Sequence, residues 1–302
     1  TADLQTLARD TYLQIRRAHA YQIALKDLFG DHNPASRCIW KSLSLSIRGD
    51  LAGQAQQIRQ FLGITLEEQI AWKSDDIALK QWRQAVEDCG VFVFKAAFKQ
   101  KDISGFCLMD ENLPVIYLNN STTKTRQIFS LLHELAHLLL SINGLSKFDT
   151  DYIARLPESE KQLEIFCNAI AAEILIPGRD FAIQAERFPA NIEAAPETLL
   201  SDLAGRYGVS REVILRRFLD LGRVSKIFYE DKAKRWAAQK QPAGGGNWYL
   251  NQGAYLSDRF AKEVVSRHFR GQISLEQASD FLGIKPKSYA GFEERILQGS
   301  GA

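Results

Sequence analysis

The sequence predicts an α+β fold in which a small, mainly antiparallel sheet lies between helical regions of the chain. Three short runs rich in β-branched and aromatic residues, at 91–95, 103–109 and 114–119, predict the strands. The residues before 90 and after 123 instead show the apolar spacing and end signals of amphipathic helices. With 302 residues the chain is long enough for two domains and a sizeable core.

Residues 1–89 are expected to form a helical N-terminal region. The pattern predicts a helix over 3–29, ended by Gly30, and a less regular helical stretch over 37–62. Thr65 and Glu68 have the spacing of a capping box. Ser74 is a plausible N-cap of a further helix, which the glycine at position 90 would end.

Two longer helices are expected after the sheet. The first covers about 123–142, with Ser121, Thr122 or Thr123 as its cap, and the second covers 157–175 after Pro157. Two short helices with a glycine turn between them are expected next. A glycine-rich break then separates them from the last helical part of the chain. The predicted segments are a helical region at 1–89, a core at 90–195, a helix-turn-helix-like segment at 196–240 and a helical C-terminal region at 241–302.

Composition excludes several classes of protein. A formal net charge of +2 is too small to imply a polyanionic partner. The four cysteines form no CxxC pair, which argues against a zinc ribbon or a disulfide scaffold and suits a reducing cytosol. The N-terminal stretch is charged and helical in pattern, unlike a signal peptide, and no run of 18 apolar residues predicts a membrane span. We therefore expect a cytoplasmic protein without a membrane partner.

The stretch FSLLHELAHLLLSI carries His133, Glu134 and His137 within an apolar helix. Residues four apart project from one helix face, so both imidazoles can reach one Zn²⁺. Glu134 lies roughly 100° round the helix from His133 and can act as general base on a water that the metal activates. This is the HExxH pattern of metallopeptidases. The same carboxylic acid can afterwards protonate the leaving amine.

The alternative is a chance match that only forms a hydrogen-bonded pair in the core. Such a match would occur in about one chain of this composition in two hundred. Unpaired charge in an apolar helix would cost several kcal/mol, and a metal removes that conflict. The metal site is therefore the favoured interpretation.

A third protein ligand is expected from the helix at 157–175. Glu160 and Glu164 lie on one face together with Asn168, whereas Glu173 faces about half a turn away. Glu164 adjoins the apolar stripe of this helix and Glu160 lies near its start, so Glu164 is favoured while Glu160 and the other carboxylates stay open.

With these residues in place, TRQIFSLLHELAHLLL followed by EIFCNAIAAEILIPG resembles the ImmA/IrrE metallopeptidases. The second helix of that family has the form E-x-x-A-N-x-F-A-A-E-L-L-x-P. This chain has Cys167 where alanine is usual and Ile170 where phenylalanine is usual. The resemblance covers about 90–225 and places the third zinc ligand at Glu164. The C-terminal tail is similar to that of longer members.

The resemblance implies a zincin-like catalytic core, a cytoplasmic location and a narrow substrate range. Characterised members cleave a helix-turn-helix repressor and so release stress-response or mobile-element genes. We therefore expect a zinc-dependent endopeptidase that cleaves a transcriptional repressor or an antitoxin-like regulator. The alternative is a non-catalytic regulatory module that senses metal or a partner, and contacts DNA or protein through its helical C-terminal region.

Several further residues have two interpretations. Asn168 either hydrogen-bonds a ligand or substrate, or makes a helix–helix contact. Tyr117, Tyr152 and Arg126 are candidates to stabilise an oxyanion, although a structural role is commoner for each, and the sequence does not choose among them. Cys107 and Cys167 are expected to be buried packing residues, with a redox role for a thiol near zinc as a hypothesis.

Two surfaces are candidates for binding larger partners. The strand at 103–108 could be an edge strand that pairs with an extended substrate, or an interior strand. Residues 205–241 contain ten Lys and Arg against four Asp and Glu, including Arg211, Arg216, Arg217 and Arg223. A DNA-reading helix is one interpretation, and a solvated face or a docking surface for an acidic substrate is the favoured one.

Overall fold

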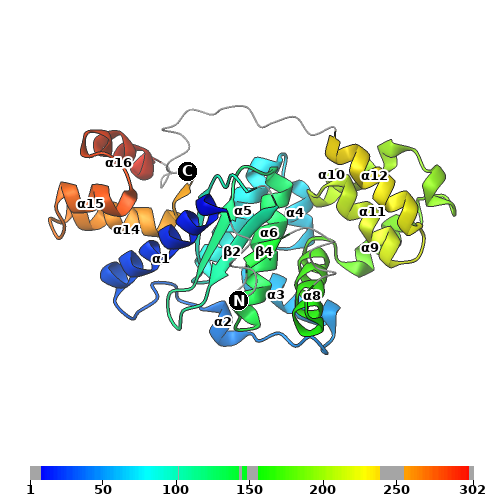
Figure 1. Ribbon diagram of the computed structural model, residues 1–302, viewed down its shortest axis with the longest axis horizontal. Coiled ribbons are helices and arrows are strands. Elements are labelled where there is room, and N and C mark those ends of the chain that lie inside the picture. The colour runs from blue at the N-terminus through cyan, green and yellow to red at the C-terminus, as the bar shows by residue number, and fades with distance from the viewer. Residues whose placement is uncertain (1–7, 101, 143–144, 148–155, 239–254, 299–302) are drawn as a thin grey trace.

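The computed structural model describes residues 8–100, 102–142, 145–147, 156–238 and 255–298, and it has the predicted α+β architecture (Figure 1). Helices surround a small sheet on both faces. The helices before the sheet are α1 (Arg9–Phe29), α2 (Ile39–Ser42), α3 (Leu51–Leu62), α4 (Leu66–Ala71) and α5 (Asp75–Asp88). The predicted capping signals are confirmed at the starts of α4 and α5, where Thr65 and Ser74 accept backbone N–H groups.

The sheet has four strands in the order β1-β3-β2-β4. They are β1 (Phe92–Ala96), β2 (Ile103–Leu108), β3 (Val115–Asn119) and the short β4 (Leu145–Lys147). β1 runs parallel to β3, whereas β2 runs antiparallel to both β3 and β4, so the sheet is mixed with mainly antiparallel pairing. The three strands expected from the sequence are confirmed, and β4 is an addition.

Two helices of the core carry the residues of interest. α6 (Lys124–Leu139) begins at Thr123, whose side chain accepts the backbone N–H of Arg126, and it is buried almost throughout because it packs against the sheet, α5 and α8. α8 (Glu158–Leu175) starts after Pro157 and ends before Pro177, as the sequence predicted. The contact between α6 and α8 brings their facing side chains together.

The chain continues from α8 through a helical unit at one end of the molecule (Figure 1). Its elements are α9 (Gly178–Ala185), η2 (Ile192–Ala194), α10 (Glu197–Tyr207), α11 (Arg211–Asp220) and α12 (Lys226–Ala238). The turn between α10 and α11 holds Gly208 at φ 65°, a conformation that favours glycine, and Ser210 caps α11. This segment therefore has the expected helix, glycine turn, helix arrangement.

The last helices lie at the opposite end of the molecule, beside α1 (Figure 1). They are α14 (Asp258–Phe269), α15 (Leu275–Leu282), η3 (Pro286–Ser288) and α16 (Tyr289–Gln298). A second glycine turn, at Gly283 with φ 64°, separates α15 from η3 and α16. The division of the chain into four segments remains a prediction, because the packing crosses its boundaries.

The two faces of the sheet belong to two different hydrophobic clusters. Val93, Ile116 and Leu118 face α5, α6 and α8, whereas Phe94 and Tyr117 face α1 and α14–α16. This alternation follows from the period of two along a strand. The first and last helices of the described chain thus share one core against the outer face of the sheet.

Buried polar groups fasten the C-terminal helices to the rest of the chain. The Arg83 guanidinium donates to the carbonyls of Val93 and Leu256 and lies 3.3 Å from the Glu87 carboxylate. Glu87 accepts the backbone N–H of Asp258 at the start of α14, at 3.1 Å. These contacts join α5, β1 and α14, so the C-terminal helices are an integral part of this core.

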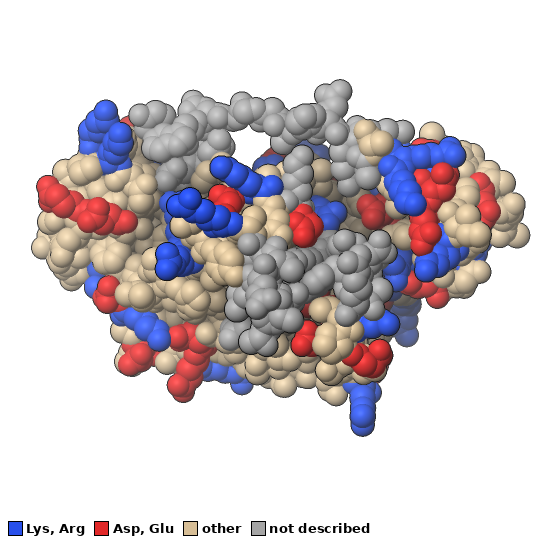
Figure 2. All heavy atoms as spheres, viewed as in Figure 1, with Lys and Arg blue, Asp and Glu red and all other residues tan. Residues whose placement is uncertain are grey.

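Acidic and basic side chains are interspersed over the visible surface, in agreement with the small net charge (Figure 2). No helix in the described part of the chain is both long and apolar enough to cross a membrane.

Candidate metal centre

α6 presents His133 and His137 from one face, as their spacing predicted. Their Nε2 atoms lie 3.1 Å apart, and each side chain is 1% exposed. The leucines around them, which are almost completely buried, fix the helix against the sheet and α8. Two ring nitrogens held this close must share a proton or a cation.

α8 supplies the third group at the same point. The Glu164 carboxylate oxygens lie 3.3 Å from each Nε2 atom. One nitrogen from each histidine and one oxygen of Glu164 lie within 4.8 Å of one another. The structure thus brings together the three residues predicted as ligands. Of the alternatives on α8, Glu160 is exposed, and Glu173 is bound elsewhere.

The charges of the three groups are strongly coupled. Burial would raise the pKa of Glu164, but its contacts with both histidines lower that pKa to about 2. Burial would likewise lower the pKa of His137, yet contacts with Cys167 and Glu164 hold it well above its ordinary value. The carboxylate is therefore ionised, and it favours positive charge between the imidazoles.

This donor set fits a zinc ion. Two imidazole nitrogens and one carboxylate are a known protein ligand set of catalytic zinc sites, which keep a fourth position open. The buried carboxylate and the close pair of ring nitrogens provide the charge and the spacing that a divalent cation requires.

Glu134 lies next to this cluster and faces the sheet. Its side chain is 0% exposed. A Cβ atom added to Gly105 of β2 would lie only 3.6 Å from Glu134 Oε1, so the carboxylate approaches the strand where no side chain intervenes. The sequence did offer a signal for this contact, because a glycine within a strand often marks a close approach.

The prediction that Cys107 and Cys167 are buried packing residues is confirmed, since both thiols are almost completely inaccessible. Cys167 also contacts the His137 ring, and burial raises the pKa of its thiol. In this chain a sulfur atom therefore lies beside one of the candidate ligands.

The three candidates for stabilising an oxyanion lie in different parts of the chain relative to the metal centre. Tyr117 is excluded, because its ring faces the opposite side of the sheet and its hydroxyl hydrogen-bonds Gln14 at 3.2 Å. Alternation along β3 places it there. Tyr152 lies outside the described residues. Arg126 is half-buried in the first turn of α6, where burial lowers its pKa and the charge of Glu212 opposes that effect.

Asn168 lies one turn beyond Glu164 on the same face of α8. Its Oδ1 atom is buried and accepts no hydrogen bond from any residue that the structure describes. Both interpretations of Asn168, a contact with a ligand or substrate and a helix–helix contact, therefore stay predictions.

Of the two interpretations of the strand at 103–108, edge or interior, the structure has the interior one. β2 pairs with β3 on one side and with β4 on the other. A register shift between Ile103 and Gly105 interrupts its pairing with β4. The short β4, which follows α6 in the chain, was not foreseen because three residues give no periodic signal.

The four arginines of the basic segment are used within the chain. Arg211 and Arg216 pair with Glu197 and Asp220 at 3.1 Å each. Arg223 donates to the carbonyls of Ala185 and Pro189. Arg217 pairs with Glu173 at 2.5 Å. All four arginines thus have partners within the chain.

Glu173 and Arg217 form a contact that sequence reasoning missed. Glu173 Oε1 accepts the backbone N–H of Gly178 at 2.7 Å, and its Oε2 lies 2.5 Å from Arg217 of α11. Arg217 also donates to the carbonyl of Ile176. The pair joins the end of the ligand helix α8 to the helix-turn-helix-like unit.

Arg59 and Gln69 hold the same end of α8 from the N-terminal side. Arg59 donates to Ile174 O at 2.6 Å and to Gln69 Oε1 at 2.7 Å, and Gln69 donates to the carbonyls of Leu175 and Tyr207. The helix that carries Glu164 is thus fixed by buried polar contacts from both flanking regions.

Comparison with known proteins agrees with this geometry. Residues 86–219 match the sequence model of peptidase family M78, described as an IrrE N-terminal-like domain. The matched range contains all three candidate ligands and Glu134. No curated protein matches the chain.

Proposed function

Residues 86–219 form an IrrE N-terminal-like domain of peptidase family M78, and from that premise we propose that the chain is a zinc-dependent endopeptidase. The observation that carries the proposal is the convergence of His133, His137 and Glu164 beside Glu134. Zinc is the proposed metal because two imidazoles and one carboxylate, with the histidines in an HExxH helix, are a ligand set of catalytic zinc sites.

When bound, Zn²⁺ would polarise the scissile carbonyl and lower the pKa of an attacking water to near neutral. Glu134 would accept a proton from this water as its oxygen bonds to the carbonyl carbon. The same carboxyl group would return the proton to the amide nitrogen as the C–N bond breaks. The buried position of Glu134, one residue from a ligand, suits both transfers.

We propose that the substrate is a transcriptional repressor or an antitoxin-like regulator, cleaved in an accessible loop in a stress or mobile-element response. The resemblance of the two ligand helices to ImmA/IrrE metallopeptidases supports this choice. As a binding partner of the chain, protein is favoured over DNA, because the arginines of α11 are paired within the chain. We place this activity in the cytoplasm, in keeping with four free cysteines.

The test is co-expression with regulators encoded beside the chain, using the wild type and Glu134→Gln. We expect a cut regulator only with the wild type, while zinc content and thermal stability are the same in both proteins. Cleavage that persists in Glu134→Gln would exclude Glu134 as the base. A cellular response that persists without cleavage would instead support a non-catalytic regulatory binding module.

A further inference from the structure

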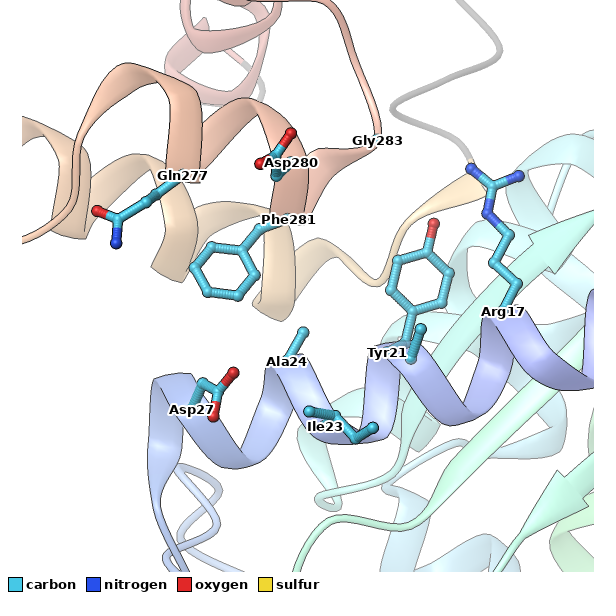
Figure 3. A pocket seen from close by; sticks show the side chains of 10 residues that line it. Arg17, Tyr21, Ile23, Ala24, Asp27, Gln277, Asp280, Phe281 and Gly283 are labelled. Atoms are coloured by element: carbon cyan, nitrogen blue, oxygen red, sulfur yellow. The ribbon is translucent and has the colours of Figure 1, made fainter.

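A groove of about 450 Å³ lies between α1 and α15, on the side of the sheet away from the metal centre (Figure 3). We call it the α1–α15 groove. Ala20 and Ala24 of α1 and Phe281 of α15 provide apolar lining. It therefore joins the first and the last parts of the described chain, and nothing in the proposed peptidase chemistry uses it.

The rim of this groove on α1 exposes apolar side chains. Ile23, which lines the groove, is 64% exposed, and Leu13, which lies outside the groove nearer the start of α1, is 50% exposed. Ala20 lies about 20° round α1 from Leu13, and Ile23 lies about 60° further round, so these residues spread over about 80° of one side of the helix. Apolar surface that continues from a groove onto its rim is typical of a binding site for protein.

Acidic side chains flank the apolar lining from both helices. Asp27 of α1 and Asp280 of α15 both line the groove. Neither carboxylate takes part in an ion pair among the described residues, whereas Asp110 nearby is paired with Lys26 at 2.9 Å. Arg17 lies at the far end, over the ring of Tyr21. The groove is thus complementary to an apolar side chain with basic neighbours.

The same charges argue against nucleic acid at this place. α15 begins the second helix, glycine turn, helix arrangement, and the first helix of such a unit commonly approaches the DNA backbone. Here its exposed residues include Glu276 and Asp280, which would repel phosphates. A protein segment satisfies both the apolar lining and the acidic flanks.

We propose that the α1–α15 groove docks an amphipathic helix of a protein partner. Its apolar side chains lie against Ala24 and Phe281, and its lysines or arginines pair with Asp27 and Asp280. This is the helix-in-groove mode of recognition, in which apolar anchors give affinity and flanking charges give specificity. Because the groove lies on the opposite side of the sheet, docking does not require a functional metal centre.

The experiment measures fluorescence anisotropy of a labelled amphipathic helix of about 14 residues, with leucines at helical spacing and flanking lysines. An analogue with glutamates in place of the lysines is the second probe. The full chain is compared with Asp27→Lys/Asp280→Lys, with Ala24→Trp, which fills the groove without changing charge, and with Glu134→Gln. Glu186→Lys/Asp202→Lys is the matched control, since it makes the same change in net charge on exposed residues outside the groove.

We expect saturable binding of the lysine helix, at least about tenfold weaker binding of the glutamate helix, and a similar loss in both groove variants. The matched control and Glu134→Gln should bind within about twofold of the wild type. The proposal is overturned by absent binding to folded wild type, by equal binding in the groove variants, or by preference for the glutamate helix. Labelled duplex DNA that binds the wild type and is weakened by Ala24→Trp would also overturn it.

Discussion

The ion pair between Glu173 and Arg217 is expected to stabilise the fold at the C-terminal end of α8. In Glu173→Ala, the partly buried backbone N–H of Gly178 loses its acceptor, and the Arg217 guanidinium loses its carboxylate partner. Glu173 is only 9% exposed and Arg217 is 16% exposed, so solvent compensates little. Zinc binding should be unaffected, because Glu173 points away from the metal centre.

Breaking a buried ion pair costs about 3–5 kcal/mol. Arg217 keeps one acceptor, the carbonyl of Ile176 at 2.8 Å, which reduces the expected loss to about 2–3 kcal/mol. Glu173→Gln retains an acceptor for Gly178 and removes only the charge, so about 1–2 kcal/mol is expected. A cycle with Arg217→Met should give a coupling energy of about 1–2 kcal/mol.

The assay is calorimetric or fluorescence-detected thermal unfolding of five zinc-loaded proteins, with zinc content measured in parallel. They are the wild type, Glu173→Ala, Glu173→Gln, Arg217→Met and the double variant Glu173→Ala/Arg217→Met. The alanine variant should melt about 4–12 °C lower than the wild type, given a loss of about 2–3 kcal/mol and about 2–4 °C per kcal/mol for a chain of this size. An unchanged melting temperature would refute the energetic role of the pair. Loss of zinc from a protein that is still folded would refute the assignment of Glu173 to a site remote from the metal.

Three further predictions follow from the core. Glu164→Gln should weaken zinc binding by about 100-fold or more, which exceeds the loss typical of residues that only hydrogen-bond a ligand. The affinity is measured by competition with a chromogenic chelator, and an unchanged affinity would remove Glu164 from the ligand set. Burial raises the pKa of Glu87 to about 7. Between about pH 4.5 and about pH 7 the folded state therefore keeps a proton that the unfolded state has released. The free energy of unfolding should fall as the pH rises from the lower to the higher of these values. Glu87→Gln should abolish that slope, worth at most about 3 kcal/mol, in urea midpoints taken at about pH 5 and about pH 8. A Cβ atom on Gly105 would lie 3.0 Å from Tyr117 O and 3.6 Å from Glu134 Oε1. Gly105→Ala should therefore lower the free energy of unfolding in urea by about 1–3 kcal/mol. It should also slow cleavage while zinc stays bound.

The metal centre was predictable because its residues are set by local geometry. A spacing of four places His133 and His137 on one helix face whatever the rest of the fold does. The choice of Glu164 over Glu160 followed from its place beside the apolar stripe of α8, and the structure brings it to both histidines. Helix caps such as Thr123 are local in the same sense.

The features that could not be predicted depend on contacts between distant residues. β4 is too short to carry a pattern, so the sequence left open whether the strand at 103–108 is an edge or an interior strand, and the structure shows that it is interior. Tyr117 faces away from the metal because of the register of β3, which the sequence alone does not reveal. The return of α14–α16 to the sheet rests on bonds such as that from Arg267 to the Leu28 carbonyl, with no signal in either segment alone.

The shared core of α1 and α14–α16 has a consequence for biosynthesis. During translation α1 emerges about 230 residues before α14. At about 5–20 residues per second, its apolar side chains would wait roughly 10–50 s for the helices that cover them. Tyr21 and Leu25 would be accessible to chaperones throughout that interval. A ribosome that stops before α14 would therefore release a chain whose metal-binding helices are complete but whose sheet is covered on one side by α1 without α14–α16, which leaves apolar surface prone to aggregate.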